Sequence, residues 1–161
     1  MKKVLIIFGI LILALVGYFT YQSYSGKPKT PNISESFTDK GFSISGLGKS
    51  IDTEYVSDPM NSDFGVAIYP NSQPAANVQS AGKVDIGGEK ALIGTFRTSD
   101  SLAKVVTFYT KQMGSQAVTG DVESNGVTYK IIKNQNNQGT VISVYTQDNS
   151  TLFILVKPIK T

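Results

Sequence analysis

The sequence predicts an α+β protein: an antiparallel sheet of hairpins with one main amphipathic helix packed on it, preceded by an N-terminal transmembrane helix. Three observations predict this class. An apolar run opens the chain directly after Lys2 and Lys3. One later stretch repeats its apolar residues at helical spacing. Several short runs of strand-forming residues are separated by turn residues, without the β-α-β alternation of a parallel sheet.

Residues 1–24 are predicted to anchor the protein in a membrane. Between residues 4 and 19 only Gly9 and Gly17 fall outside the hydrophobic class, and the aromatic residues that follow extend the run to about the 17 residues that a spanning helix needs. Lys2 and Lys3 predict a cytoplasmic N-terminus for this single-pass anchor, and hence an extracytoplasmic domain after it. The apolar residues that we expect to contact lipid are Val4, Leu5, Ile6, Ile7, Phe8, Ile10, Leu11, Ile12, Leu13, Leu15, Val16 and Phe19.

A cleaved secretory signal is the alternative interpretation of the same leader. Such signals end in small residues around the cleavage site, and Ser23-Tyr24-Ser25 before Gly26 is the available match. The length of the run and its aromatic exit favour an anchor. Residues 25–36 are rich in Ser, Pro, Lys and Thr and are predicted to be a linker, so that residues 37–161 form the folded domain.

The first half of that domain shows short strand signals. Phe42 and Ile44 alternate with serines as in a short strand, and residues 37–63 are otherwise ambiguous. Phe64–Tyr69 is a short apolar run that Pro70 ends, which predicts a buried strand. The ranges 78–86 and 90–98 flank Gly87-Gly88-Glu89 and predict a hairpin, because paired glycines accept the positive φ of tight turns.

A helix is predicted from residue 102 to residue 113. Its stripe has the spacing i, i+3, i+4, i+7 and i+11, and Gly114 supplies the C-terminal stop. Thr98-Ser99-Asp100 offers cap candidates before it. The stripe consists of Leu102, Val105, Val106, Tyr109 and Met113.

The C-terminal part predicts successive hairpins. Strand-like runs cover residues 117–123, 127–133 and 140–147, and residues 151–157 are a possible further strand. The segments between them are rich in Asn, Gly, Asp and Ser, which tolerate turn geometry.

Composition excludes several classes of chemistry. The chain contains no Cys and no His, which removes disulfides, thiolate nucleophiles, Ser-His-Asp triads and His-ligated metals. Its net charge of +3 includes Lys2 and Lys3 of the leader, so the domain lacks the basic excess typical of nucleic-acid binding. We expect no cofactor, no metal and no nucleic-acid partner.

Three polar stretches could each form a binding site, and each also has a purely structural interpretation. Residues 43–50 end like a phosphate-binding loop, but Ser43 replaces its first glycine and a strand pattern follows. Asp58, Asn61 and Asp63 supply calcium-type oxygens, although Asp and Asn are common in turns for backbone reasons alone. The amides of residues 134–138 fit a sugar site or a solvated hairpin loop. Most tyrosines, among them Tyr55, Tyr69, Tyr129 and Tyr145, are expected to be half-buried strand residues.

Ser101 and Lys104 match the S-x-x-K motif of a class of serine enzymes. Their S-x-x-K spacing at a helix start matches that of penicillin-binding enzymes, where Lys lies one turn from the nucleophilic Ser. The companion S-D-N and K-T-G motifs are absent. Ser101 is therefore read as a first-turn residue and Lys104 as a solvated one, with a small envelope serine hydrolase as the alternative.

The segments Tyr69-Pro70, Thr98-Ser99-Asp100-Ser101 and Val105-Val106-Thr107-Phe108-Tyr109 resemble a loosely defined group of prokaryotic membrane-anchored envelope proteins. That group combines a "YP" strand end with a "TxDSxxxVVxFY"-like helix and is itself largely uncharacterised. The resemblance implies a membrane-tethered α+β domain and no particular activity.

Taken together, the sequence predicts a membrane-tethered extracytoplasmic module that binds an envelope protein or a surface polymer. The hydrolase is one alternative. An accessory subunit of a membrane complex is another, in which Gly9 and Gly17 share one face of the leader helix, although they lack the G-x-x-x-G spacing of close packing.

Overall fold

The computed structural model describes residues 34–38, 41–45, 51–75, 80–86, 88–124, 126–135 and 139–159. The chain divides into two compact units, residues 1–31 and residues 32–161, and every described residue belongs to the second. The predicted leader and most of the predicted linker lie outside the described residues. Among the residues described, no helix is both long and apolar enough to cross a membrane.

The second unit is built on one sheet of ten strands in which every pairing is antiparallel. Nine strands follow the order β1-β2-β3-β5-β6-β10-β9-β8-β7. The short strand β4 pairs with the same edge of β6 as β5 does, at residues further along β6. The strands are β1 (Ser34–Thr38), β2 (Gly41–Ser45), β3 (Ile51–Tyr55), β4 (Gln73–Pro74), β5 (Ala81–Ile86), β6 (Glu89–Thr98), β7 (Ala117–Ser124), β8 (Val127–Asn134), β9 (Val141–Gln147) and β10 (Ser150–Ile159).

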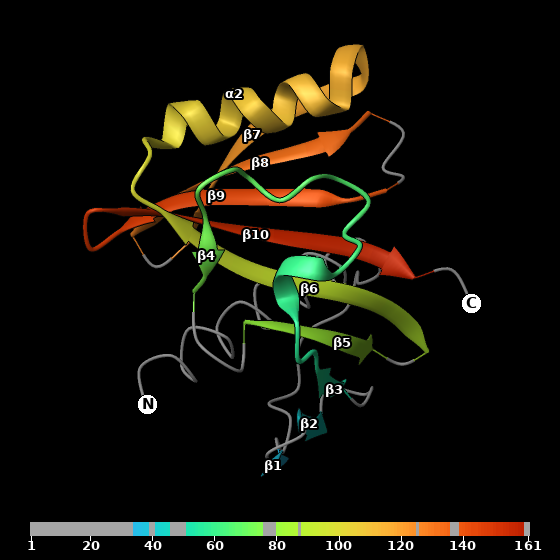
Figure 1. Ribbon diagram of the computed structural model, residues 1–161. Helices are drawn as coiled ribbons and strands as arrows, with labels where there is room; N and C mark the ends of the chain where they lie inside the picture. The colour runs from blue at the N-terminus through green and yellow to red at the C-terminus, as the bar shows by residue number, and fades with distance from the viewer. Residues whose placement is uncertain are drawn as a thin grey trace. The chain divides into compact units, whose positions relative to one another are not determined.

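One α-helix, α2 (Leu102–Met113), packs over β7, β8 and β9 (Figure 1). Two short 3-10 turns, η1 (Pro59–Asn61) and η2 (Gly114–Gln116), complete the described elements. The antiparallel α+β architecture that the sequence predicts is thus confirmed for the described residues. The helix bounds are confirmed as well, and Gly114 ends it with a φ of 64°. Its N-cap is Ser101, not one of the three residues before it.

Turn chemistry explains the confirmed hairpins. Asp148 and Asn149 join β9 to β10 with φ values of 50° and 61°. Two left-handed residues in a two-residue loop match the twist of the strands that they connect. Gly88 has a φ of 94° in the equivalent turn between β5 and β6. All four predicted C-terminal strands are present, as is the short strand at residues 41–45. In addition, β1 begins at Ser34, within the range predicted as linker.

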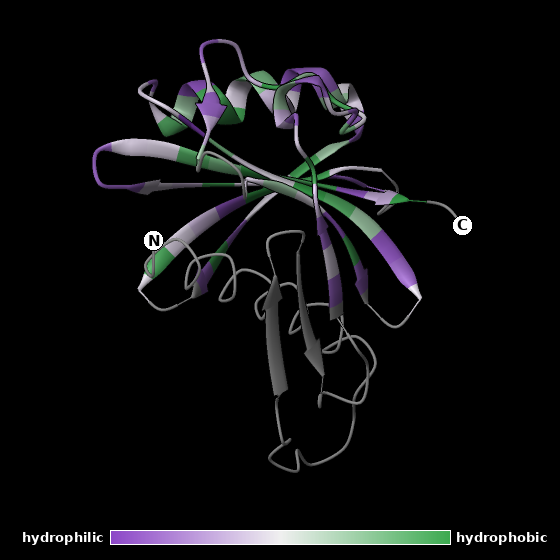
Figure 2. Ribbon diagram, turned by 60° about the horizontal axis from the view of Figure 1, so that its bottom comes forward, coloured by the Kyte–Doolittle hydropathy of each residue, from purple (hydrophilic) through white to green (hydrophobic). Residues whose placement is uncertain are grey.

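The core lies between the sheet and α2. Val105 and Tyr109 of the helix are fully buried against Phe153 and Leu155 of β10. Ile154 is also buried, at 1% exposure, although it points to the opposite face. Buried residues on both faces explain why β10 is a nearly continuous apolar run. Hydrophobic residues accordingly lie along the middle of the strands, and hydrophilic ones toward the strand ends (Figure 2).

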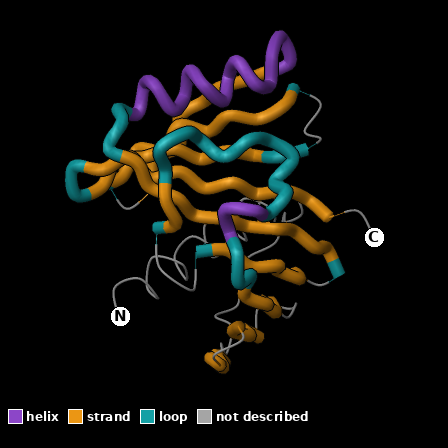
Figure 3. Tube along the Cα trace, viewed as in Figure 1, coloured by secondary structure: helices purple, strands orange, loops and turns teal. Residues whose placement is uncertain are grey.

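The predicted strand at Phe64–Tyr69 is wrong. These residues belong to a segment, residues 62–72, that crosses the face of the sheet as a loop (Figure 3). We call it the crossing segment. Its side chains alternate as in a strand, since Phe64, Val66 and Ile68 pack into the core while Gly65 and Ala67 are exposed. The backbone joins no ladder, so periodicity predicted the burial but not the hydrogen-bond partners.

Candidate functional site

The backbone of the crossing segment forms hydrogen bonds with side chains of α2 in place of a neighbouring strand. The Gln112 amide accepts a hydrogen bond from the Ala67 N–H at 2.9 Å and donates one to the Ala67 carbonyl at 3.4 Å. The hydroxyl of the buried Tyr109 accepts one from the N–H of Tyr69 at 3.1 Å. Backbone groups near the core need such partners. The helix therefore fixes the height of this loop above the sheet.

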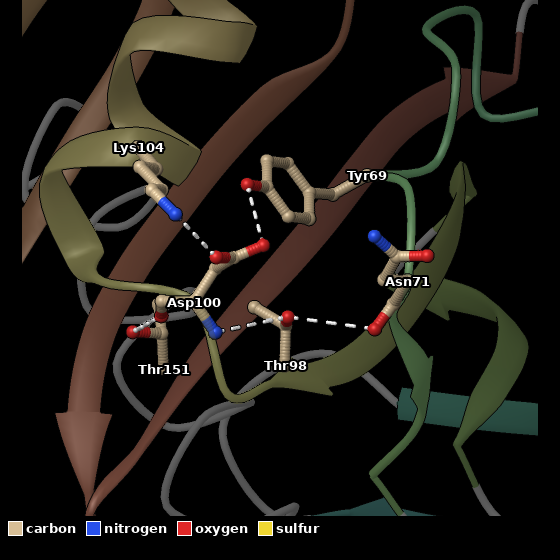
Figure 4. Close-up of polar contacts among 6 residues, drawn as sticks. All are labelled: Tyr69, Asn71, Thr98, Asp100, Lys104 and Thr151. Atoms are coloured by element: carbon tan, nitrogen blue, oxygen red, sulfur yellow. Dashed lines mark hydrogen bonds and ion pairs between the residues drawn. The ribbon is translucent and has the colours of Figure 1, made fainter.

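A polar junction ties the end of the crossing segment to the start of α2 (Figure 4). The Tyr69 hydroxyl donates to Asp100 at 3.0 Å, and Lys104 pairs with the other oxygen of the same carboxylate at 2.8 Å. Thr151 of β10 donates to the Asp100 carbonyl at 2.7 Å. Lys104 is the main reason that the pKa of Asp100 lies below its usual value, with the Tyr69 hydroxyl second.

The contacts of this junction also decide whether Lys104 could act as the base of the S-x-x-K motif. The ion pair with Asp100 raises the pKa of Lys104, whose side chain is 68% exposed. A lysine base must be neutral and is normally desolvated to become so. Ser101 is itself exposed and serves as the helix N-cap residue through its backbone. These contacts favour a structural role for both residues.

The oxygens of the calcium-like cluster are used within turns. Asp58 caps η1 by accepting from the backbone N–H and the side-chain amide of Asn61 at 3.3 and 2.7 Å. Asp63 accepts from the N–H of Gly65 at 2.8 Å and pairs with Lys157 of β10 at 2.6 Å. No group of three or more acidic residues arranged for a metal occurs among the described residues. The turn interpretation of these residues is the one that the contacts support.

The other polar stretches are only partly described. Strand β3 follows the phosphate-loop-like stretch, as its alternation predicts, while residues 46–50 lie outside the described part. Residues 136–138 of the amide-rich loop lie outside it too. Tyr145 and Tyr129 contact each other on neighbouring strands, with ring centroids 4.9 Å apart. Tyr55 and Tyr129 are half-buried strand residues, as predicted. The prediction is wrong for Tyr145, which is in a strand but buried, and for Tyr69, which is buried in the crossing segment and not in a strand.

An open groove lies on the helix-bearing face of the sheet, beside the crossing segment. Its volume is about 1060 Å³. Strands β3, β5, β6 and β10 supply its floor, and the crossing segment supplies a wall. The lining residues are Glu54, Tyr55, Val56, Ser57, Ser62, Asp63, Gly65, Lys83, Leu92, Gly139, Thr140, Lys157, Pro158 and Ile159.

Two side chains, Lys157 and Thr140, hold the wall of this groove in place. Lys157 reaches from β10 to both the carboxylate of Asp63, at 2.6 Å, and its backbone carbonyl, at 3.1 Å. The hydroxyl of Thr140 donates to the carbonyl of Phe64. Lys157 is the main cause of the lowered pKa of Asp63. The groove is therefore a preformed feature of the fold.

The groove combines apolar residues with charges of both signs. Leu92 forms part of its floor, and Ile159 lies at the end of β10 with 36% of its surface exposed. Lys83 and Glu54 are exposed cross-strand partners on β5 and β3, and neither has an ion pair among the described residues.

Sequence patterns gave no signal for this groove. Its residues come from separate segments that only the strand order brings together. Comparison of the chain with models of known families, with curated proteins and with solved structures gives no significant match.

Proposed function

We propose that this protein is a membrane-tethered binding module of the cell envelope, with residues 37–161 on the extracytoplasmic side. Its groove binds an extended segment of another envelope protein. The single observation that carries the binding role is the preformed groove, whose lining combines apolar side chains with exposed charges of both signs. The tether rests on the apolar leader after Lys2 and Lys3.

The lining favours a polypeptide over a sugar polymer. Leu92, Val56 and Ile159 offer apolar surface to side chains of a partner, which is how peptide grooves gain affinity. Lys83 and Glu54 stand as neighbouring charges that set the orientation of a mixed-charge segment. Tyr55 is the one aromatic residue in the lining, so the groove has no row of rings on which sugars stack.

Site-specific photo-crosslinking in membranes of the producing cells tests the groove. A photoreactive residue replaces Ile159 in the full chain, and a matched variant carries it at Met60. Met60 is similarly exposed, at 42%, and lies outside the groove lining. We expect a discrete adduct from position 159 only, which protease digests and which maps to one peptide of the partner. The exchange Lys83→Glu should weaken that adduct.

Other outcomes would overturn the proposal. Equal adducts from positions 60 and 159 would mean that the contact is not specific to the groove. An adduct that resists protease but is cut by glycan hydrolases would identify a surface polymer as the occupant. Absence of any adduct from position 159 would remove the groove as a binding site.

A further inference from the structure

Strand β7 forms the end of the sheet and leaves its outer edge unpaired among the described strands. Six consecutive residues, 118–123, are exposed. Two of them are valines, Val118 at 40% and Val122 at 48%. Edge strands are normally protected from further pairing by charged side chains, especially lysines, or by prolines or bulges. β7 has no Lys, Pro or bulge, and its eight-residue ladder with β8 is regular. Its charged residues are Asp121, which pairs with Lys130 of β8, and Glu123 near its end.

Both exposed valines lie on the same face of the strand, and Gly120 lies midway between them. Alternate residues of a strand share a face, so Val118, Gly120 and Val122 form one row. A Cβ atom added at Gly120 would meet nothing within 4 Å. The row is therefore symmetric about an open central position.

We propose that β7 pairs antiparallel with β7 of a second copy of this chain, about a two-fold axis at Gly120. This register places Val118 of each copy opposite Val122 of the other on one face. On the opposite face it places Thr119 opposite Asp121, where the hydroxyl donates to the carboxylate. Apolar cross-strand pairs and hydroxyl–carboxylate pairs both stabilise antiparallel sheets. Such a contact is self-complementary, as a two-fold interface requires.

Charge selects this register over its neighbours. An axis at Asp121 would place the two Asp121 carboxylates directly opposite each other, which is destabilising. An axis at Thr119 would place Val118 opposite Gly120 and leave Val122 without an apolar partner. In the Gly120 register the two Asp121 residues are diagonal neighbours only, and each already pairs with Lys130 of its own chain at 2.7 Å.

Engineered cysteines test the pairing, because the natural chain has none. The full chain carrying Gly120→Cys is solubilised in mild detergent and then exposed to a mild oxidant. We expect a disulfide-linked dimer, since the two residues face each other across the axis. Thr146→Cys is the matched control, as Thr146 is a small exposed residue on the interior strand β9. It should remain monomeric.

Mixed cysteine variants report the register. Val118→Cys mixed with Val122→Cys should cross-link more than either variant alone. Val118→Lys combined with Gly120→Cys should reduce the dimer to the level of the Thr146→Cys control. Cross-linking of Gly120→Cys no greater than that control would overturn the proposal, as would a heavier adduct with a different protein. Preferential self-linking of Val122→Cys would contradict the register.

Discussion

The ring of Phe64 lies over Gly94, in the space that a side chain at position 94 would need. A Cβ atom built on Gly94 comes within 2.4 Å of the Cζ atom of Phe64. Phe96 closes the same space from the side, with its ring edge-on to that of Phe64 and a centroid distance of 5.6 Å. The missing side chain on β6 thus lets the crossing segment lie against the sheet, and the crossing segment forms the wall of the groove.

Gly94→Ala should destabilise the fold by about 1–3 kcal/mol, because the new methyl group forces the Phe64 ring out of its place. Urea unfolding measures the change. Ser115→Ala is the control, since Ser115 is an exposed residue just after α2, and should change stability by less than about 0.5 kcal/mol. Combining Gly94→Ala with Phe64→Leu should cost less than the two single changes added together. Strict additivity would contradict a direct contact.

Gln112→Ala should loosen the crossing segment while leaving α2 intact. The change leaves both backbone groups of Ala67 without their helix partner, at a cost of about 1 kcal/mol. Hydrogen exchange of the Ala67 amide should become faster than in the parent protein. Thr107→Ala, at an exposed position of the same helix, should leave that rate unchanged. An unchanged rate in Gln112→Ala would mean that this amide is protected in another way.

Stability should fall in acid because two carboxylates are ion-paired in the folded protein. Lys104 lowers the pKa of Asp100, and Lys157 lowers that of Asp63. A lowered folded pKa stabilises the protein above the unfolded value of about 3.9, and this stabilisation is lost as pH falls through the folded pKa. Unfolding midpoints at pH 7 and pH 3 measure the loss. It should be smaller in Asp100→Asn, and an equal loss would exclude Asp100 as a contributor.

Stability should also fall in alkali, through a buried tyrosine. Burial raises the pKa of Tyr145 to about 12, so it stays neutral while tyrosines of the unfolded chain ionise near pH 10. The unfolded state then binds fewer protons, and stability declines as pH rises from about 10 to about 12. Denaturant midpoints across that range should decline less steeply in Tyr145→Phe. A slope identical to that of the parent would contradict the assignment.

Local patterns predicted most of the elements. The stripe from Leu102 to Met113 sets the helix, and turn residues such as Asp148 and Asn149 set the hairpins. The exception is Phe64–Tyr69, where the alternation is real but reflects packing across a sheet instead of pairing within one. Its backbone partners, Tyr109 and Gln112, lie some forty residues away, and no local rule could assign them.

The groove and the β7 edge depend on strand order, which the sequence left open. Lys83 lies opposite Glu54 because β5 pairs with β3, and Lys157 reaches Asp63 because the crossing segment lies over the sheet beside β10. In the same way, Val118 and Val122 resembled ordinary strand residues until β7 proved to be the last strand of the sheet. A hairpin pattern predicts neighbours along the chain, whereas these features come from neighbours across it.

A single-cysteine labelling experiment tests the tether and its orientation most directly. Thr107→Cys places the only thiol of the chain at an exposed position of α2. Spheroplasts of the producing cells are treated with a membrane-impermeant maleimide, and the membrane fraction is analysed by mass. We expect labelling without lysis, on a full-length chain that stays in the membrane fraction. Labelling only after lysis, or a labelled soluble product that begins at Gly26, would contradict it.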